Sequence, residues 1–526
     1  MMIDGLHNRK KKILFIHFVN DYGSLGIEYI SASLKRAGHQ TDLILHHGPE
    51  KYFASRLYNK VSAFNPDFVC FSTVTFEYLW ASKVARFIKE ITGAKTVFGG
   101  IHPTSCPEEI IRHPFVDYLV VGEGDEAIID LVENPENTEI KNVWTKKNGE
   151  IIRNEVRPLL QDLDLLPFPD KELFYRDAPY LKYTYLCISG KGCPFRCSYC
   201  FNNFMRNLYH GEKWTRKRSV DNLIEELKVM KERFGYKQIE FFDDCFTVDK
   251  KWLIDFSKKY KEEINVPFKA ISHPSYINRE TAERLKDMGC IKLQLGAQTA
   301  TEKIRRDICK RQDSNECILN AVREAKRVGI IATVDHIFGL PGETNEDYEK
   351  GLEFYIDVKP HRYITFWLQY YPNTEIIEIG KKYGTVNDEL MKDVEKGRVT
   401  HGAKGIDPKT LEIARFMHFI PILPRCVSRF ILRKRLYPKI FRYTFFSNIH
   451  VLVLHFYSLD LFKALVWITK RIIHRKRALS HANIDGKKMA IPQPLEHNNK
   501  ELSFNTWSHY QYQTDEGVFA RDKKDA

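Results

Sequence analysis

Short apolar runs alternate with amphipathic stretches along the first quarter of the chain. Between about residue 12 and residue 133, five runs rich in branched and aromatic residues predict strands separated by helical connections. The runs read KILFIHFV, TDLILHH, DFVCFST, KTVFGG and DYLVVGEG. This alternation predicts a doubly wound parallel sheet, whose ligands bind beyond the carboxyl ends of its strands.

The same alternation resumes further along, from Tyr183 to about residue 385. Its six apolar runs read YLCISGKGC, QIEFFDDCF, FKAISHPS, IKLQLGAQT, ATVDHIFGLPGE and YITFWLQYYP. They predict a partial (β/α)6 barrel with its chemistry at the carboxyl ends of the strands. Between the two regions, the dipeptide Asn148-Gly149 predicts a hairpin.

We therefore predict an α/β protein with several parts, because 526 residues exceed a single core. The expected parts are a basic tail (1–11), the sheet domain (12–135), a hairpin and linker (136–182), the barrel (183–385), a mainly helical region (386–480) and a flexible polar tail (481–526). The 11 cysteines are odd in number and lack paired spacings, which indicates a reducing cytoplasm. The basic start leads into a short apolar run without a small-residue cleavage site, so we expect a tail and a strand there rather than a signal peptide.

Three cysteines carry the most specific chemistry in the chain. Cys193, Cys197 and Cys200 have C-x3-C-x2-C spacing after the first predicted barrel strand. Three thiolates can hold three irons of a 4Fe–4S cluster and leave the fourth iron open to a substrate. A structural zinc site is the alternative, but it needs a fourth ligand, and the next candidate, His210, lies ten residues further on.

With Tyr199 before its last cysteine, this motif resembles that of the radical SAM superfamily. The resemblance implies that the methionyl end of S-adenosylmethionine (SAM) chelates the open iron. An electron, delivered by a reductant such as flavodoxin or ferredoxin, would cleave SAM to methionine and a 5′-deoxyadenosyl radical. That radical would abstract hydrogen from an unactivated carbon.

Several polar residues stand at the ends of the predicted barrel strands. By the same resemblance, Gly296, Gln298 and Thr299 correspond to a family G-x-E-S segment near SAM, with an uncharged Gln in place of Glu. We expect these three residues, Tyr199 and Asp243 to bind the cofactor. Further candidates are strand-end residues and two arginines at a common family position, each with a structural role as the alternative: Asp244, His273, Asp335, His336, Tyr370, Arg216 and Arg218.

The first region resembles the cobalamin-binding domain of the B12-dependent branch of that superfamily, through GGIHPT and VVGEGD. The resemblance implies that strand-end loops contact cobalamin, through Asp21, Gly23, Ser72, Gly99, Gly100, His102, Gly122 and Gly124. The related loop D-x-H-x-x-G supplies a histidine below cobalt, but here Gly23 takes that position, so we expect no imidazole ligand from this loop. The alternatives are a fold that binds no corrinoid and a nicotinamide site, although no G-x-G-x-x-G follows the first strand.

Near the C-terminus, 13 Lys or Arg between Arg425 and Arg477 face one acid, Asp460, which gives +12 of the net +13. Within this stretch, the apolar segment from Ile449 to Ile473 ends in a basic cluster, as interfacial membrane anchors do. A helix that caps the barrel is the alternative. A nucleic-acid partner is not expected, because the resemblance to RNA-modifying methylthiotransferases is confined to the triad.

The leading hypothesis is a cobalamin-dependent radical SAM methyltransferase that acts on a hydrophobic, lipid-borne carbon. The alternative enzyme is a radical oxidative cyclase like the anaerobic magnesium-protoporphyrin ester cyclase, which has the same domain order. A protein that binds an iron–sulfur cluster and SAM without turnover is the third hypothesis. Transfer of label from methyl-labelled SAM separates the first from the second, and formation of 5′-deoxyadenosine separates both from the third.

Overall fold

The computed structural model describes residues 10–18, 23–46, 50–398 and 407–441. Its first sheet has seven strands in the order β2-β1-β3-β4-β5-β6-β7. All five predicted strands of this region form, and they pair in parallel. They are β1 (Lys12–Phe18), β2 (Gln40–His46), β3 (Phe68–Ser72), β4 (Lys95–Gly99) and β5 (Tyr118–Val120).

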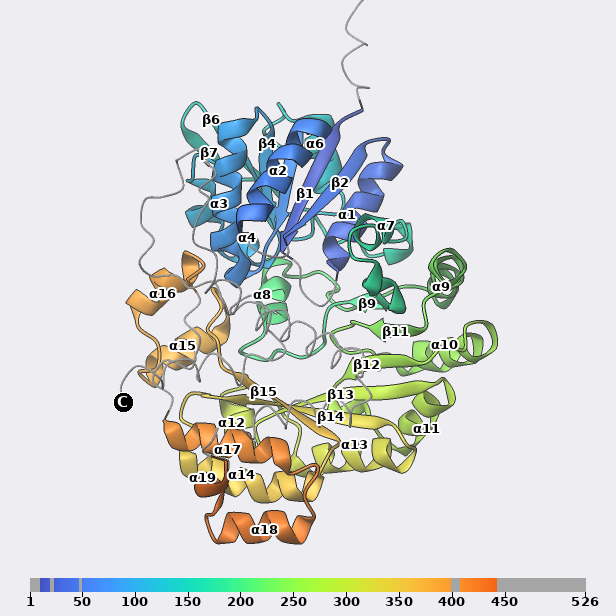
Figure 1. Cartoon of the computed structure of the whole chain (residues 1–526), viewed down its shortest axis with the longest axis vertical. Coiled ribbons are helices and arrows are strands. Elements are labelled where there is room, and N and C mark those ends of the chain that lie inside the picture. The colour runs from blue at the N-terminus through green and yellow to red at the C-terminus, as the bar shows by residue number, and fades with distance from the viewer. Residues whose placement is uncertain (1–9, 19–22, 47–49, 399–406, 442–526) are drawn as a thin grey trace, which may run out of the picture.

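Helices cover both faces of this sheet (Figure 1), and two apolar clusters fill the spaces between the helices and the sheet. The strands are therefore buried on both faces, which explains the run of four consecutive apolar residues, 13–16, in β1. The helices of this layer are α1 (Leu25–Arg36), α2 (Glu50–Phe64), α3 (Thr75–Ile91), α4 (Ile101–Ser105), α5 (Pro107–Ile111) and α6 (Ala127–Glu133).

The predicted hairpin extends this first sheet. Asn148 and Gly149 have φ values of 52° and 84°, as the turn of a two-residue hairpin requires. Strand β6 (Val143–Lys147) pairs antiparallel with β5, and β7 (Glu150–Ile152) follows at the edge. The chain then crosses through α7 (Glu172–Tyr175) to the second sheet.

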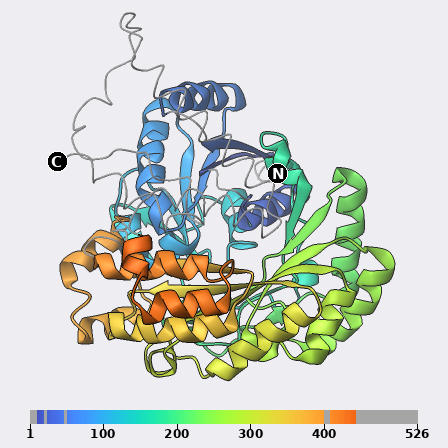
Figure 2. The ribbon, with the colours of Figure 1, turned by 60° about the horizontal axis from the view of Figure 1, so that its bottom comes forward.

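The second sheet has six parallel strands in the order β15-β14-β13-β12-β11-β8, so the partial barrel is confirmed. Helices pack against its outer face (Figure 2). Its strands are β8 (Thr184–Cys187), β11 (Gln238–Phe241), β12 (Phe268–Ser272), β13 (Cys290–Gln298), β14 (Ile331–Phe338) and β15 (Arg362–Trp367). A small ribbon of β9 (Gly190–Lys191) and β10 (Arg216–Lys217) flanks the first strand.

The helices of this half follow the strands in chain order. They are α8 (Phe201–Leu208), α9 (Val220–Phe234), α10 (Lys250–Glu263), α11 (Arg279–Asp287), α12 (Glu302–Asp307), α13 (Asn315–Arg327), α14 (Asn345–Val358), α15 (Glu375–Lys382) and α16 (Asp388–Glu395). A last group, α17 (Pro408–Phe419), α18 (Arg425–Arg433) and α19 (Tyr437–Ile440), packs beyond α14. Within the described ranges, every helix is too short or too polar to span a bilayer. The anchor predicted at 449–473 lies outside these ranges.

Alternate residues of the barrel strands point to opposite sides. On β13, Leu293 and Leu295 join the core against the outer helices, which leaves Lys292 and Gln294 on the inner side. The same alternation leaves further polar side chains on the inner side, namely Glu240, Lys269, Asp335 and Arg362. The inside of the barrel therefore carries charged and polar side chains beside apolar ones such as Ile364 and Phe366, whereas the outer side packs against the helices.

Candidate functional site

The three cysteines lie on the loop between β9 and α8, and later parts of the barrel fix the backbone of this loop. The Ser198 amide donates to the Cys309 carbonyl at 3.2 Å, and the Ser198 hydroxyl donates to the Ile308 carbonyl at 2.5 Å. The Ile376 amide, at the start of α15, donates to the Ser198 carbonyl at 2.9 Å. The loop therefore has a defined shape before any ligand binds.

Glycine and an aromatic stack hold the beginning of the loop. Gly192 has φ +86°, and a Cβ there would lie 2.4 Å from the Trp214 carbonyl oxygen. Only glycine fits at this point. Three residues on, the ring of Phe195 stacks on His273, with centroids 3.8 Å apart. His273, predicted as a site residue, therefore supports the cluster loop from the end of β12.

The triad fits a 4Fe–4S cluster in its donor chemistry. Burial raises the pKa of Cys193 to about 12 and that of Cys200 to about 11, so iron would have to displace the protons. Among the described residues, no three His, Cys, Asp or Glu side chains are gathered closely enough for a single metal ion. A cluster places each thiolate on a different iron, so its sulfurs are spread more widely than the ligands of one ion.

The predicted SAM-binding segment ends β13 with an irregular turn. Gln298 has φ +67°, and the register shifts between Gly296 and Gln298. Arg311 donates to the Gly296 carbonyl at 2.7 Å and pairs with Asp313. Gly296 and Gln298 are thus brought together at the carboxyl end of the sheet, with a buried guanidinium beside them.

Thr299 contacts Glu343, a candidate site residue that was not predicted from the sequence. Its hydroxyl donates to the Glu343 carboxylate, and burial raises the pKa of Glu343 to about 8. Glu343 lies in the LPGE turn after β14. The sequence feature that could have identified Glu343 is a carboxyl residue next to a glycine, in the turn directly after a strand. The protonated form can donate a hydrogen bond, whereas the ionised form can only accept.

Asp243 and Asp244 follow β11 and face different surroundings. Asp243 accepts from the backbone and hydroxyl of Ser189, at 2.9 Å and 2.5 Å, and pairs with Lys217. Asp243 is buried, and both of its carboxylate oxygens have protein partners. Asp244 is solvent-exposed, and desolvation by the surrounding protein raises the pKa of its carboxyl.

Three of the other predicted residues have partners within the protein. The His336 Nδ1 is 2.7 Å from the Tyr355 hydroxyl on the outer helix α14, and burial lowers the pKa of His336 to about 3. The Tyr370 hydroxyl is 2.7 Å from that of Thr385. Asp335, which precedes His336 on β14, instead faces the inside of the barrel and accepts from the Gln294 amide at 2.9 Å.

On the first sheet, buried polar side chains follow the ends of β3 and β4. The Thr73 hydroxyl is buried and makes no hydrogen bond in the described part of the chain, whereas the buried His102 ring lies beside the Glu395 backbone. The ring of His102 packs 4.7 Å from that of Tyr78. Buried polar groups normally have partners. The Thr73 hydroxyl fits a ligand rich in amides, as the rim of cobalamin is.

Ser72 and the glycines nearby set how closely the loops approach each other. A Cβ on Gly100, which has φ +96°, would lie 2.9 Å from the Thr73 backbone and 3.1 Å from the Ser72 hydroxyl. A Cβ on Gly99 would make only ordinary contact with Val120, at 3.7 Å. Gly100 is thus required for loop packing.

The GEGD loop after β5 contacts the barrel. A Cβ on Gly122 would lie 2.1 Å from the Tyr209 hydroxyl, which also accepts from the Glu123 amide at 2.7 Å. Glu123 binds Arg216 with both oxygens, and the neighbouring Asp125 pairs with Lys191 at 2.8 Å. At Gly124, a Cβ would come within 3.2 Å of the Val120 side chain. This loop therefore joins the two sheets next to the cysteine loop, a role that the sequence did not reveal.

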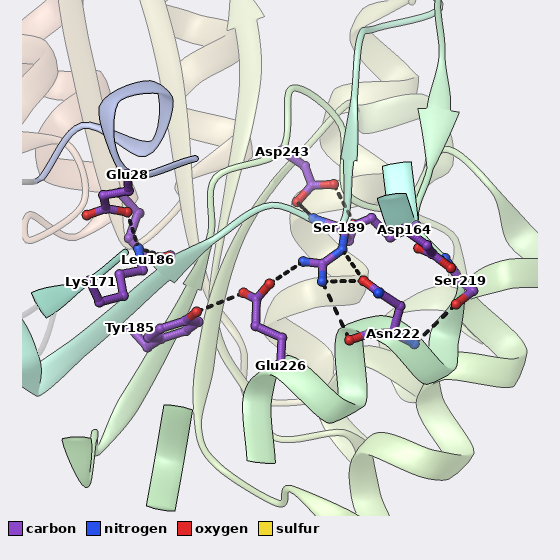
Figure 3. A network of polar contacts seen from close by, with 11 residues as sticks. Glu28, Asp164, Lys171, Tyr185, Leu186, Ser189, Ser219, Asn222, Glu226 and Asp243 are labelled. Atoms are coloured by element: carbon purple, nitrogen blue, oxygen red, sulfur yellow. Dashed lines mark hydrogen bonds and ion pairs between the residues drawn. The ribbon is translucent and has the colours of Figure 1, made fainter. Parts of the chain in front are cut away.

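Gly23 also makes a protein contact, while Asp21 lies outside the described residues. A Cβ on Gly23 would lie 2.7 Å from the Glu28 carboxylate and 3.4 Å from Phe174. Glu28 pairs with Lys171 at 2.6 Å, and the two side chains are 2% and 1% exposed. Lys171 also donates to the Leu186 carbonyl of β8 at 2.6 Å (Figure 3). The first sheet, the linker and the barrel thus meet at one ammonium group.

A second part of this network stands beside the first. Tyr185 donates to Glu226 at 2.7 Å (Figure 3), and Glu226 also binds Arg218 at 2.6 Å. Arg218 also donates a hydrogen bond to the Asn222 side chain, and the Ser219 amide donates to the Asp164 carboxylate of the linker. Arg216 and Arg218, named from the sequence, are both used in structural contacts between parts of the chain.

Comparison with known proteins agrees with this arrangement. The family model for the radical SAM superfamily matches residues 187–355, and that for the B12 binding domain matches residues 11–132. An uncharacterized methyltransferase of Pyrococcus horikoshii is 32% identical over 340 residues, which cover 63% of this chain and 72% of the relative. The anaerobic magnesium-protoporphyrin IX monomethyl ester cyclase of Rubrivivax gelatinosus is 24% identical, over 69% of this chain and 68% of the relative.

Solved structures share the fold. The cobalamin-dependent SAM radical enzyme OxsB has a TM-score of 0.62 at 14% identity, over 89% of this chain and 81% of that one. The radical SAM methyltransferase TsrM of Kitasatospora setae has a TM-score of 0.61 at 15% identity, over 71% of this chain and 78% of that one. Fold and cysteine loop together define a radical SAM enzyme.

The chain belongs to the B12-binding-domain radical SAM superfamily, in its cobalamin-dependent methyltransferase branch. Its cofactors are a 4Fe–4S cluster, SAM and cobalamin. The contacts of individual residues with these cofactors remain predictions.

The contact between Gly23 and Glu28 sharpens the prediction for cobalt. Glycine carries no donor, and even a methyl group at this position would meet the Glu28 carboxylate. We expect the Co(II) form to show no strongly coupled axial nitrogen in electron paramagnetic resonance. A nitrogen-split spectrum, or absence of corrinoid binding, would contradict this prediction.

Proposed function

We propose that this enzyme transfers a methyl group from SAM to an unactivated carbon of a hydrophobic substrate. The observation that carries the proposal is the direct joining of the two sheets beside the cysteine loop, through the contact of the GEGD loop with Tyr209 and Arg216. A cobalamin held at the ends of β3 and β4 would then share one site with a cluster held by the triad. When bound, these cofactors supply the electron-transfer and methyl-transfer chemistry that no side chain offers.

The chain's own residues define the surroundings of the reacting carbon. Phe242, after β11, and Ile101, after β4, are 43% and 40% exposed although both are large and apolar. Both follow the carboxyl end of a strand, where substrates of such sheets bind. They support an apolar reacting part of the substrate, while Asp244 adds an exposed carboxyl after the same strand as Phe242.

The barrel also carries polar side chains on its inner side. Gln294 and Asp335 form a hydrogen-bonded pair there, and burial raises the pKa of Asp335 to about 7. The pair can accept hydrogen bonds from a hydroxyl or amine of the substrate. The proposed substrate is therefore hydrophobic around the reacting carbon and carries a polar group elsewhere.

Oxidative cyclisation is the second candidate, because the relative from Rubrivivax gelatinosus aligns over most of both chains. Anaerobic protein with all three cofactors, a strong reductant, methyl-labelled SAM and a lipid extract of the source cells separates the two. Label in an apolar product supports methyl transfer to a hydrophobic substrate. Formation of 5′-deoxyadenosine without transfer of label favours the cyclase, and label confined to polar products contradicts the hydrophobic substrate.

Two partners complete the proposal. A reductant such as flavodoxin or ferredoxin would deliver the electron to the cluster. Contact with a membrane surface, predicted from residues 449–473, would bring the enzyme to lipid-borne substrates. That segment lies outside the described residues, so its role as an anchor stays a prediction from the sequence.

A further inference from the structure

Helix α18 lies at the end of the molecule opposite the first sheet (Figure 1). Its inner face is buried through Ser428, Ile431 and Leu432, and α14 is the helix against which it packs. Arg425 fixes its start, because the guanidinium donates to the carbonyls of Ile356 and Asp357 at the end of α14. The helix therefore holds one orientation, with a defined outer face.

The outer face combines apolar and basic side chains. Val427 and Phe430 are 39% and 56% exposed, and the exposed Cys426 adjoins them. Arg433 and Lys434 continue the same face one turn further on, since residues three and four apart lie on one side of a helix. We call these five residues the α18 face. An exposed phenyl ring beside two cations is unlike the charged, apolar-free surface of an ordinary solvated helix.

The surroundings of the α18 face are strongly basic. Residues 423–441 contain six Lys or Arg and no Asp or Glu. Arg429 pairs with Asp357 and Arg435 with Glu349, so part of this charge holds the helix in place. In the described part of the chain, no acid pairs with Arg433, Lys434 or Lys439. A partner that covers this surface should be negatively charged.

We infer that the α18 face is a docking surface for an anionic lipid bilayer. Amphipathic helices that lie at a membrane surface present an apolar centre with basic residues beside it, as this face does. The chain's own residues 442–480 carry seven Lys or Arg and one Asp, the same sign of charge, which argues against their covering it. The inference is independent of the reaction catalysed and does not rely on the predicted anchor at 449–473.

The experiment is sedimentation of the full-length protein with vesicles of phosphatidylcholine, with or without phosphatidylglycerol. Each basic residue near an anionic surface contributes about fivefold to partitioning. Arg433→Glu/Lys434→Glu should therefore weaken binding to the anionic vesicles by about thirtyfold or more at low salt. Phe430→Ser should remove much of the binding that survives high salt, because apolar burial is not screened.

A matched control carries the same change of charge on another helix. Lys251 and Lys258 are exposed on α10, on a different side of the molecule (Figure 1), and Lys251→Glu/Lys258→Glu should bind as the wild type does. Equal loss in this control would reduce the effect to net charge and overturn the proposal. So would unchanged binding of the α18 variants, or a wild type that ignores anionic vesicles. Loss of binding to single-stranded RNA in the α18 variants, with no vesicle binding, would assign the surface to nucleic acid instead.

Discussion

Replacing Cys193, Cys197 and Cys200 together by alanine is expected to abolish both the 4Fe–4S cluster and the reductive cleavage of SAM. Each single replacement should do the same, because each thiolate binds a different iron and no nearby thiol stands at ligand spacing. The measurements are iron and sulfide content, the absorbance of the anaerobically reconstituted protein, and formation of 5′-deoxyadenosine.

A matched control tests whether the loss is specific to these thiols. Cys317, on α13, is also partly exposed and lies outside the loop, so Cys317→Ala should keep a full cluster. Thermal unfolding of the apo proteins shows whether the barrel itself is intact in each variant. A triple variant that still binds a stoichiometric 4Fe–4S cluster would refute the assignment of the triad.

The second large effect is expected at the junction of the sheets. Lys171→Met should destabilise the protein by about 3–5 kcal/mol, because it leaves the buried Glu28 carboxylate without its partner. The Leu186 carbonyl would also lose its donor. The measurement is the urea midpoint of the transition that includes the first sheet, together with retention of cobalamin.

Two comparisons isolate the buried charge as the cause. Adding Glu28→Gln to Lys171→Met should restore much of the stability, since no unpaired charge then remains. Lys250→Met removes a pair of similar length, 2.8 Å, whose side chains are 69% and 51% exposed, so it should leave the urea midpoint nearly unchanged. A Lys171→Met protein as stable as Lys250→Met would show that the buried pair does not join the sheets as described.

The sequence was sufficient for the two sheets, because their strands are local patterns. All eleven predicted strands form, and the cysteine spacing located the cluster loop. The sequence could not show which side of the sheet each of two neighbouring strand residues faces. Asp335 faces the inside of the barrel, whereas His336 faces Tyr355 on α14, although both stand at the end of the same apolar run.

Contacts between residues far apart in the chain could not be predicted from the local pattern of apolar and polar residues. Lys171 and Glu28 are 143 positions apart, and each looks like an ordinary surface residue in its own segment. Gly122 matched a family loop, yet its lack of a side chain is required by the Tyr209 hydroxyl, 87 residues further on. Glu343 was overlooked because its environment, rather than its spacing, makes it unusual.

The way the cysteine loop is fixed sets an order of events during synthesis. The Ser198 hydroxyl bonds to a carbonyl 110 residues later in the chain, and its backbone carbonyl accepts from Ile376, later still. A nascent chain that has emerged only as far as α8 carries its three thiols on a loop that nothing yet holds. Iron delivered at that moment would meet a flexible ligand set open to oxidation. We therefore expect a truncated chain that ends before α15 to be a poorer acceptor for a cluster than the full chain.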